Sequence, residues 1–136
     1  MKDIFGNEII RSIKKEISID GLSYIPNWIS NDEHDEYLNF IDSLEWETTL
    51  KRRVQQYGYR YDYRKAANMI MSHKDNYIGP LPDFLKKIGD RLYEEKIFSE
   101  VPDEVLVNEY LPGQGIAGHI DCLPCFGDTV CCLSLG

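Results

Sequence analysis

The sequence predicts an α+β fold, with helices packed on one side of a β-sheet core. Two stretches with the apolar spacing of amphipathic helices come first, and short strand-like runs make up the last third of the chain. The chain has 136 residues, of which 43% are hydrophobic, so it can form one domain with a core of ordinary size. We therefore expect an N-terminal arm at residues 1–16 and a folded domain at residues 17–136.

Composition limits the classes of protein to which the chain can belong. No run approaches the ~20 apolar residues of a membrane span, so no membrane partner is expected. The N-terminus lacks the layout of a signal peptide, which favours a cytoplasmic location. A net charge of −8 argues against binding nucleic acid through the whole surface. Positive charge is concentrated in residues 51–65, which contain a single acidic residue, Asp62. The basic residues of this segment are Lys51, Arg52, Arg53, Arg60, Arg64 and Lys65.

Three segments before residue 100 are expected to be regular. Residues 17–25 alternate apolar and polar side chains and predict one or two short strands. Ser30 and Glu33 have the spacing of a capping box, and the helix predicted after them has one apolar stripe: Tyr37, Leu38, Ile41 and Leu44. A second helix is expected from Pro82 to about Phe98, with the stripe Phe84, Leu85, Ile88 and Leu92.

Tyrosines alternate with other residues between the two predicted helices. In an extended chain, side chains at every second position share a face, so these rings would lie together: Tyr57, Tyr59, Tyr61 and Tyr63. Arg60 and Arg64 would lie on the other face. Aromatic rings beside arginines can stack a base and neutralise a phosphate, which predicts an accessible substrate flap near His119. An aromatic-rich hairpin packed on the domain is the alternative.

The last third of the chain contains a candidate metal site. A strand-like run at 105–110 meets a turn at 112–115, and a second strand-like run follows at 116–121. His119 and Asp121 are two residues apart in this second run, so their side chains would converge on one point. An imidazole and a carboxylate with open positions beside them suit non-haem Fe(II). Asn108 and Tyr110 have the same spacing and could direct an amide and a phenol at a group bound beside the metal.

The four cysteines all lie in the last fifteen residues: Cys122, Cys125, Cys131 and Cys132. A C-x-x-C pair with two further cysteines is compatible with a small zinc-binding module. Cys131 and Cys132 are neighbours in a predicted strand, however, so they would face opposite sides and could not share one tetrahedral site with the other two. Buried or half-buried free thiols are the expected outcome, and the cysteine-based module is kept as an alternative.

The string N-x-Y-x-P-G-x-G-I-x-x-H-x-D runs from Asn108 to Asp121, and F-G-D and L-S-L-G follow it. This ordered string resembles the core of the AlkB-like family of Fe(II)- and 2-oxoglutarate-dependent dioxygenases. The segment at 53–63, R-V-Q-Q-Y-G-Y-R-Y-D-Y, is similar to the part of those proteins that covers the substrate. The resemblance implies a double-stranded β-helix, or jelly roll, as the core.

The same resemblance implies the roles of the candidate residues. His119 and Asp121 would be catalytic Fe(II) ligands, and Asn108 and Tyr110 would contact 2-oxoglutarate. The substrate-binding residues would be Tyr57, Tyr59, Arg60, Tyr61 and Tyr63. The implied reaction is oxidative dealkylation of alkylated bases in DNA or RNA, and some members of the family act on protein instead.

The family pattern continues beyond the S-L-G strand to a second histidine ligand and to arginines that hold 2-oxoglutarate. This sequence ends at Gly136, and neither His34 nor His73 lies in a segment that matches the missing motif. We therefore expect a domain truncated at its C-terminus, with an incomplete jelly roll, weak Fe(II) binding and negligible turnover of 2-oxoglutarate. A catalytically inactive remnant that acts at most as a binding module is the alternative.

Overall fold

A computed structural model describes residues 19–61, 76–121 and 126–136, and the chain divides into two compact units, Met1–Ser30 and Asn31–Gly136. The predicted arm at 1–16 lies outside the described residues. In the first unit, residues 19–25 form no strand, contrary to the sequence prediction. A turn takes the place of the strand, because the Leu22 N–H donates to the Ile19 carbonyl at 3.0 Å and Gly21 has a φ of 79°.

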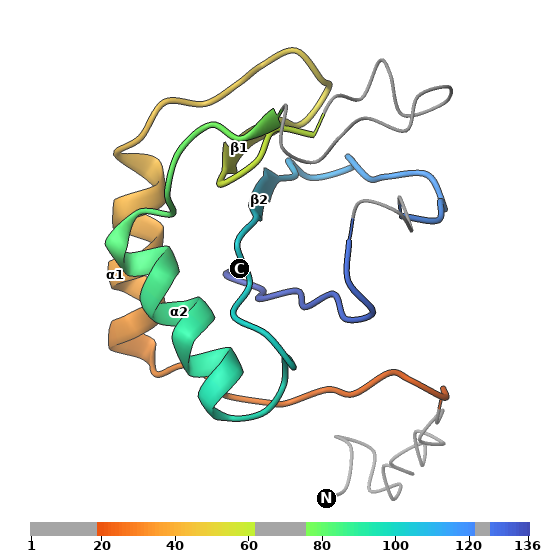
Figure 1. The fold of residues 1–136 in the computed structure, drawn as a ribbon. Coiled ribbons are helices and arrows are strands. Elements are labelled where there is room, and N and C mark those ends of the chain that lie inside the picture. The colour runs from red at the N-terminus through yellow and green to blue at the C-terminus, as the bar shows by residue number, and fades with distance from the viewer. Residues whose placement is uncertain (1–18, 62–75, 122–125) are drawn as a thin grey trace, which may run out of the picture. The chain divides into compact units, whose positions relative to one another are not determined.

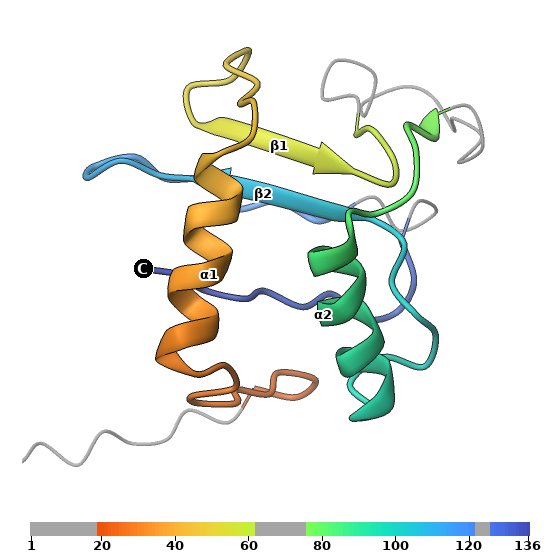
Figure 2. The ribbon, with the colours of Figure 1, turned by 90° about the vertical axis from the view of Figure 1, so that its left-hand side faces the viewer.

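The second unit contains two helices and two strands, in the order α1 Asn31–Asp42, β1 Arg53–Tyr57, α2 Asp83–Glu94 and β2 Val105–Glu109 (Figure 1). The helices lie beside each other on one side of the strands (Figures 1 and 2). The Phe84 ring of α2 joins them, with its centroid 4.0 Å from that of Phe40 and 6.2 Å from that of Tyr37. Both predicted helices are therefore present, each with apolar residues turned toward the core.

The end of α2 differs from its prediction. The helix stops at Glu94 rather than near Phe98, and Lys96 follows with a φ of 60°. The Lys96 N–H donates to the Tyr93 carbonyl and the Ile97 N–H to the Leu92 carbonyl, both at 2.9 Å. This is the Schellman pattern of a helix C-terminus, which usually has glycine at the left-handed position. A lysine there leaves no sequence signal for the stop.

β1 and β2 form an antiparallel pair in which Arg53 lies opposite Glu109 and Val54 lies opposite Asn108. Side chains alternate between the two faces of such a pair. We call one side the helix face, because the Gln55 Nε2 on it donates to the Ile41 carbonyl of α1 at 2.8 Å. The second face carries these side chains: Val54, Gln56, Leu106 and Asn108. Val54 is 0% exposed and Gln55 is 2% exposed, so both faces are covered at the centre of β1.

The runs at 116–121 and 129–135, predicted as strands, are not strands in the structure. A strand needs backbone partners along its length, and the described residues pair only β1 with β2 into a sheet. An α+β domain with a jelly-roll core therefore stays a prediction. Within the three described ranges, no helix is both long and apolar enough to cross a membrane.

The chain makes a tight approach just before β2. Gly58 follows β1 with a φ of 79°, and its α-carbon lies against the backbone of Asp103. The next residue, Glu104, is partly buried, and this burial, with a smaller effect of Asp103, raises the pKa of its carboxyl from 4.5 to about 7. Ionisation of Glu104 is therefore harder in the folded chain than in the unfolded chain.

The folded chain should lose stability as the pH rises and Glu104 ionises, and we expect Glu104→Gln to remove this loss. Between pH 4.5 and about 7 the folded state holds the Glu104 proton more tightly than the unfolded state does. The stability from this group is therefore present below pH 4.5 and is lost as the pH rises through 7. In thermal unfolding followed by circular dichroism, the variant should unfold at a higher temperature than the wild type at pH 8 and at a similar temperature at pH 4.5. An equal difference at both pH values would contradict the assignment.

Candidate functional site

Asn108 and Tyr110 lie at the end of β2. Asn108 is opposite Val54 on the second face, and Tyr110 comes one residue after the strand ends. Arg52, directly before β1, contacts both side chains. Its Nε donates to the Asn108 Oδ1 at 2.7 Å, and its Cζ is 5.9 Å from the centroid of the Tyr110 ring. The structure therefore adds Arg52 to the two predicted residues.

In the sequence, Arg52 is only one member of the basic cluster at residues 51–65. The sequence does contain a signal for the contact of Arg52 with Asn108, because Arg52 comes immediately before β1, which begins with Arg53. That signal becomes useful only when the partner strand and its register are known, because Arg52 and Asn108 are 56 residues apart.

His119 and Asp121 converge, although residues 116–121 are not a strand. The His119 Nε2 lies 3.3 Å from the Asp121 Oδ1, and each side chain is 52% exposed. The other ring nitrogen, Nδ1, lies 2.9 Å from the Ala117 carbonyl oxygen. Their nearness follows from the two-residue spacing, while their role as metal ligands stays a prediction.

The Ala117 contact determines which nitrogen of His119 can bind a cation. A carbonyl oxygen only accepts hydrogen bonds, so Nδ1 must carry a hydrogen. In the neutral ring, Nε2 then has the lone pair, and this lone pair lies beside the carboxylate of Asp121. A metal ion near both atoms would be attracted by the lone pair and by the carboxylate. Histidine ligands commonly donate their second N–H to a backbone carbonyl in the same way.

These two donors suit Fe(II), which accepts an imidazole and a carboxylate and keeps open positions. A third protein ligand does not join them in the part of the chain that the structure describes, where no three His, Cys, Asp or Glu side chains gather at one point. His34 lies elsewhere, on α1, with its Nδ1 2.9 Å from the Asp35 Oδ1. His73 is outside the described residues.

The tyrosine segment does not continue as one strand. β1 ends at Tyr57, because Gly58 takes a positive φ that a regular strand does not have. Tyr57 is on the helix face, where its hydroxyl donates to the Gln55 Oε1 at 2.9 Å and burial raises its pKa. The Tyr59 ring lies 5.3 Å from that of Tyr77.

Tyr61 has a different partner again. Its ring stacks on Phe126 at a centroid distance of 6.1 Å and an interplanar angle of 19°. Tyr57, Tyr59 and Tyr61 are all half-buried, so the described part of the predicted flap is only partly accessible. Tyr63 and Arg64 lie outside the described residues. Of the predicted rings, Tyr61 is thus connected to the F-G-D segment that follows the candidate metal ligands.

Two of the basic residues that were expected to attract phosphate are paired with carboxylates. The Arg60 Nη2 lies 3.1 Å from the Glu47 Oε1. Arg53 donates to both carboxylate oxygens of Glu109 at 2.6 Å, which lowers the pKa of Glu109, and its guanidinium lies 4.3 Å from the Trp46 ring. The sequence did not reveal these pairs, because Glu47 and Glu109 reach the arginines only through the pairing of β1 with its neighbours.

Cys131 and Cys132 are exposed free thiols, so the expectation of burial was wrong for them. The chain around them is not a strand and lies at the surface. Desolvation and the neighbouring Cys132 raise the pKa of Cys131, which disfavours the thiolate that a metal would need. Cys122 and Cys125 lie outside the described residues. The described thiols therefore give no support to a zinc module.

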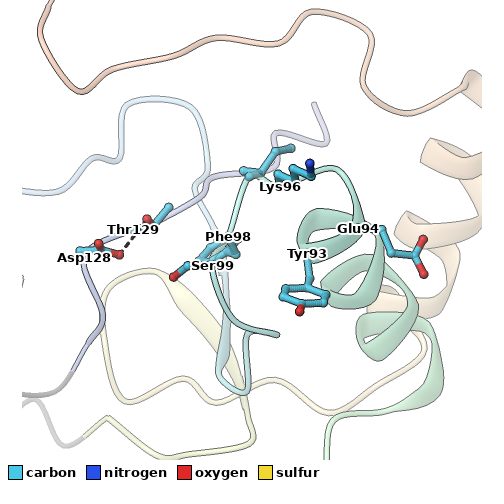
Figure 3. A pocket seen from close by; sticks show the side chains of 8 residues that line it. Tyr93, Glu94, Lys96, Phe98, Ser99, Asp128 and Thr129 are labelled. Carbon is cyan, nitrogen blue, oxygen red and sulfur yellow. Dashed lines mark hydrogen bonds between the residues drawn. The ribbon is translucent and has the colours of Figure 1, made fainter.

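A cavity of about 510 Å³ lies between the end of α2 and the segment at 128–129 (Figure 3). Its lining includes Tyr93 and Phe98 from one side and Asp128 and Thr129 from the other. None of the predicted site residues contributes to it, so it is separate from the candidate metal site.

Comparison with known proteins places the chain among several related sequences. It is 34% identical over 128 residues to the alkylated DNA repair protein ALKBH8 homolog of Arabidopsis thaliana, a match that covers 90% of this chain and 36% of the plant protein. The chain is similar to proteins of the AlkB family. It is also 28% identical over 125 residues to the DNA N6-methyl adenine demethylase of Caenorhabditis elegans, covering 88% of this chain and 41% of that one.

The uncharacterized protein L905 of Acanthamoeba polyphaga mimivirus is 30% identical over 128 residues, which covers 91% of this chain and 57% of the viral protein. The chain thus spans between about a third and three fifths of the length of these relatives. No protein-family profile matches it.

Proposed function

We propose that the chain is part of an AlkB-like Fe(II)- and 2-oxoglutarate-dependent dioxygenase with a jelly-roll core, which dealkylates nucleic-acid bases oxidatively. Similarity to a DNA repair protein and to a DNA demethylase supports the nucleic-acid substrate. The observation that carries the proposal is the arrangement of His119 and Asp121, whose nitrogen lone pair and carboxylate face each other at 3.3 Å. A metal ion bound between these two atoms would be attracted by both of them.

In the proposed enzyme, the His119 Nε2 and the Asp121 Oδ1 would hold Fe(II), and the hydrogen bond to the Ala117 carbonyl would keep the His119 ring in the required tautomer. Fe(II) would supply open positions for 2-oxoglutarate and O₂ and the oxidising chemistry. Asn108 and Tyr110 would contact 2-oxoglutarate through an amide and a phenol, and both side chains lie next to Arg52.

Tyr59 and Tyr61 are the residues best suited to stack a target base. Both are half-buried and contact other aromatic rings, which presents flat surfaces at fixed positions. A base inside a duplex would have to be flipped out to reach the iron. Tyr57 is less suited, because its hydroxyl is bound to Gln55 on the helix face. Arg60 would reach a phosphate only by leaving Glu47, from which it is separated by 3.1 Å.

We expect Fe(II) to bind this chain through His119, and we expect His119→Ala to weaken that binding at least about tenfold, because one of two protein ligands is lost. Anaerobic calorimetry of the purified chain with Fe(II) measures the affinity. His34→Ala is the matched control, because His34 also lies 2.9 Å from an aspartate but does not belong to the candidate site. The assignment would be contradicted if both variants weakened Fe(II) binding equally, or if neither variant weakened it.

A second measurement separates an active enzyme from a remnant. Succinate formation is followed with Fe(II), ascorbate and 2-oxoglutarate, in the presence of methylated DNA or RNA oligonucleotides. Succinate that depends on His119 and increases with one oligonucleotide would support the enzyme and identify the substrate class. Fe(II) binding without succinate would support the remnant that only binds.

A further inference from the structure

Arg52 connects the two residues of the N-x-Y motif to the opposite strand. Arg53 pairs with Glu109, so one further step along the same register places Arg52 opposite Tyr110. The contacts agree with this placement: the Arg52 Nε donates to the Asn108 Oδ1 at 2.7 Å, and the guanidinium carbon lies 5.9 Å from the centre of the Tyr110 ring. One side chain therefore contacts both members of the motif.

The chemistry of arginine determines how the Asn108 amide is turned. A guanidinium has hydrogen-bond donors and no acceptor, so only the oxygen of the amide can face it. The Asn108 Oδ1 is engaged in this way, so the Nδ2 of the same amide is turned away from the guanidinium. Without Arg52, the amide could turn through 180° and present its oxygen instead.

We propose that Arg52 is a positioning residue that holds Asn108 with its NH₂ group toward the ligand and so selects a ligand with an acceptor, a carboxylate, at this point. The identification of this carboxylate as that of 2-oxoglutarate rests on the proposed function, whereas the orientation of the amide does not.

A double-mutant cycle tests the orientation in the full chain without any ligand. Asn108→Asp replaces the NH₂ group by oxygen. With Arg52 present, the new carboxylate meets a guanidinium, and the unfolding temperature should stay the same or rise. In an Arg52→Gln background, the same substitution should lower the unfolding temperature. Arg52→Lys, which keeps the charge and one donor, should restore part of the difference. Additive effects of the two substitutions would overturn the proposal.

The second arm measures the affinity for 2-oxoglutarate by calorimetry in the presence of Mn(II). Arg52→Gln should weaken binding about tenfold. The double variant, Arg52→Gln with Asn108→Asp, should bind 2-oxoglutarate as weakly as the single variant Asn108→Asp does. The reason is that Arg52 acts through Asn108. Lys86→Gln is the control, since Lys86 pairs with Asp90 on the exposed side of α2.

The two arms fail separately. If the wild type does not bind 2-oxoglutarate, this chain does not take up the proposed co-substrate, and the cycle still decides whether Arg52 positions Asn108. The cycle can show that Arg52 and Asn108 are coupled while the Arg52→Gln variant binds 2-oxoglutarate as tightly as the wild type. In that case the proposal that Arg52 selects the ligand is overturned.

Discussion

Gly58→Ala is expected to destabilise the chain by about 3 kcal/mol or more, because two costs combine at this position. Gly58 has a φ of 79°, which is strained for any residue with a Cβ. A Cβ at Gly58 would also overlap the carbonyl oxygen of Asp103, so backbone would have to move. Urea unfolding of the variant and the wild type measures the difference.

Gly113→Ala separates the two costs. Gly113 has a similar φ of 84°, but a Cβ there would meet nothing within 4 Å. This control should lose only the cost of the backbone conformation, about 1 kcal/mol. If Gly58→Ala were no worse than Gly113→Ala, the close approach of Gly58 to Asp103 would not be a real constraint on the fold.

Gln55→Leu is expected to cost about 3 kcal/mol, although it places an apolar side chain in a buried site. Gln55 is 2% exposed, and its amide makes two hydrogen bonds. Its Nε2 donates to the Ile41 carbonyl at 2.8 Å, and its Oε1 accepts from the Tyr57 hydroxyl at 2.9 Å. Leucine would remove both bonds from a buried side chain, and the Ile41 carbonyl would keep only the longer bond from the Leu44 N–H, at 3.2 Å. The two lost bonds together should cost about 2–3 kcal/mol.

Gln114→Leu is the matched control for Gln55→Leu. The Gln114 amide also makes two hydrogen bonds, with the Leu111 N–H at 2.8 Å and the Lys51 carbonyl at 3.0 Å, but it is exposed. Water can replace these bonds, so a loss of about 0.5 kcal/mol or less is expected in urea unfolding. A further test is Tyr57→Phe, which should cost stability in the wild type and little in the Gln55→Leu variant. Additive losses in this pair would mean that Gln55 and Tyr57 do not interact.

Local signals predicted α1 and α2 at the observed places. A helix is stabilised by contacts between residues three and four apart, so the spacing of residues such as Ile41 and Leu85 is enough to locate it. Both of these side chains are buried. The convergence of His119 and Asp121 is local in the same sense, because the two residues are only two positions apart whether or not they belong to a strand.

The sequence by itself determined the helices, the strand at 105–109 and the short His119 to Asp121 contact. Only the tertiary structure decided that the runs at 116–121 and 129–135 do not become strands, and which charged residues meet. Arg53 pairs with Glu109, and Arg52 with Asn108, across 56 residues of sequence. Such pairs depend on the register of β1 against β2, and a shift of one residue would move every side chain to the other face. Register is a property of two distant segments together, so no pattern within either segment contains it.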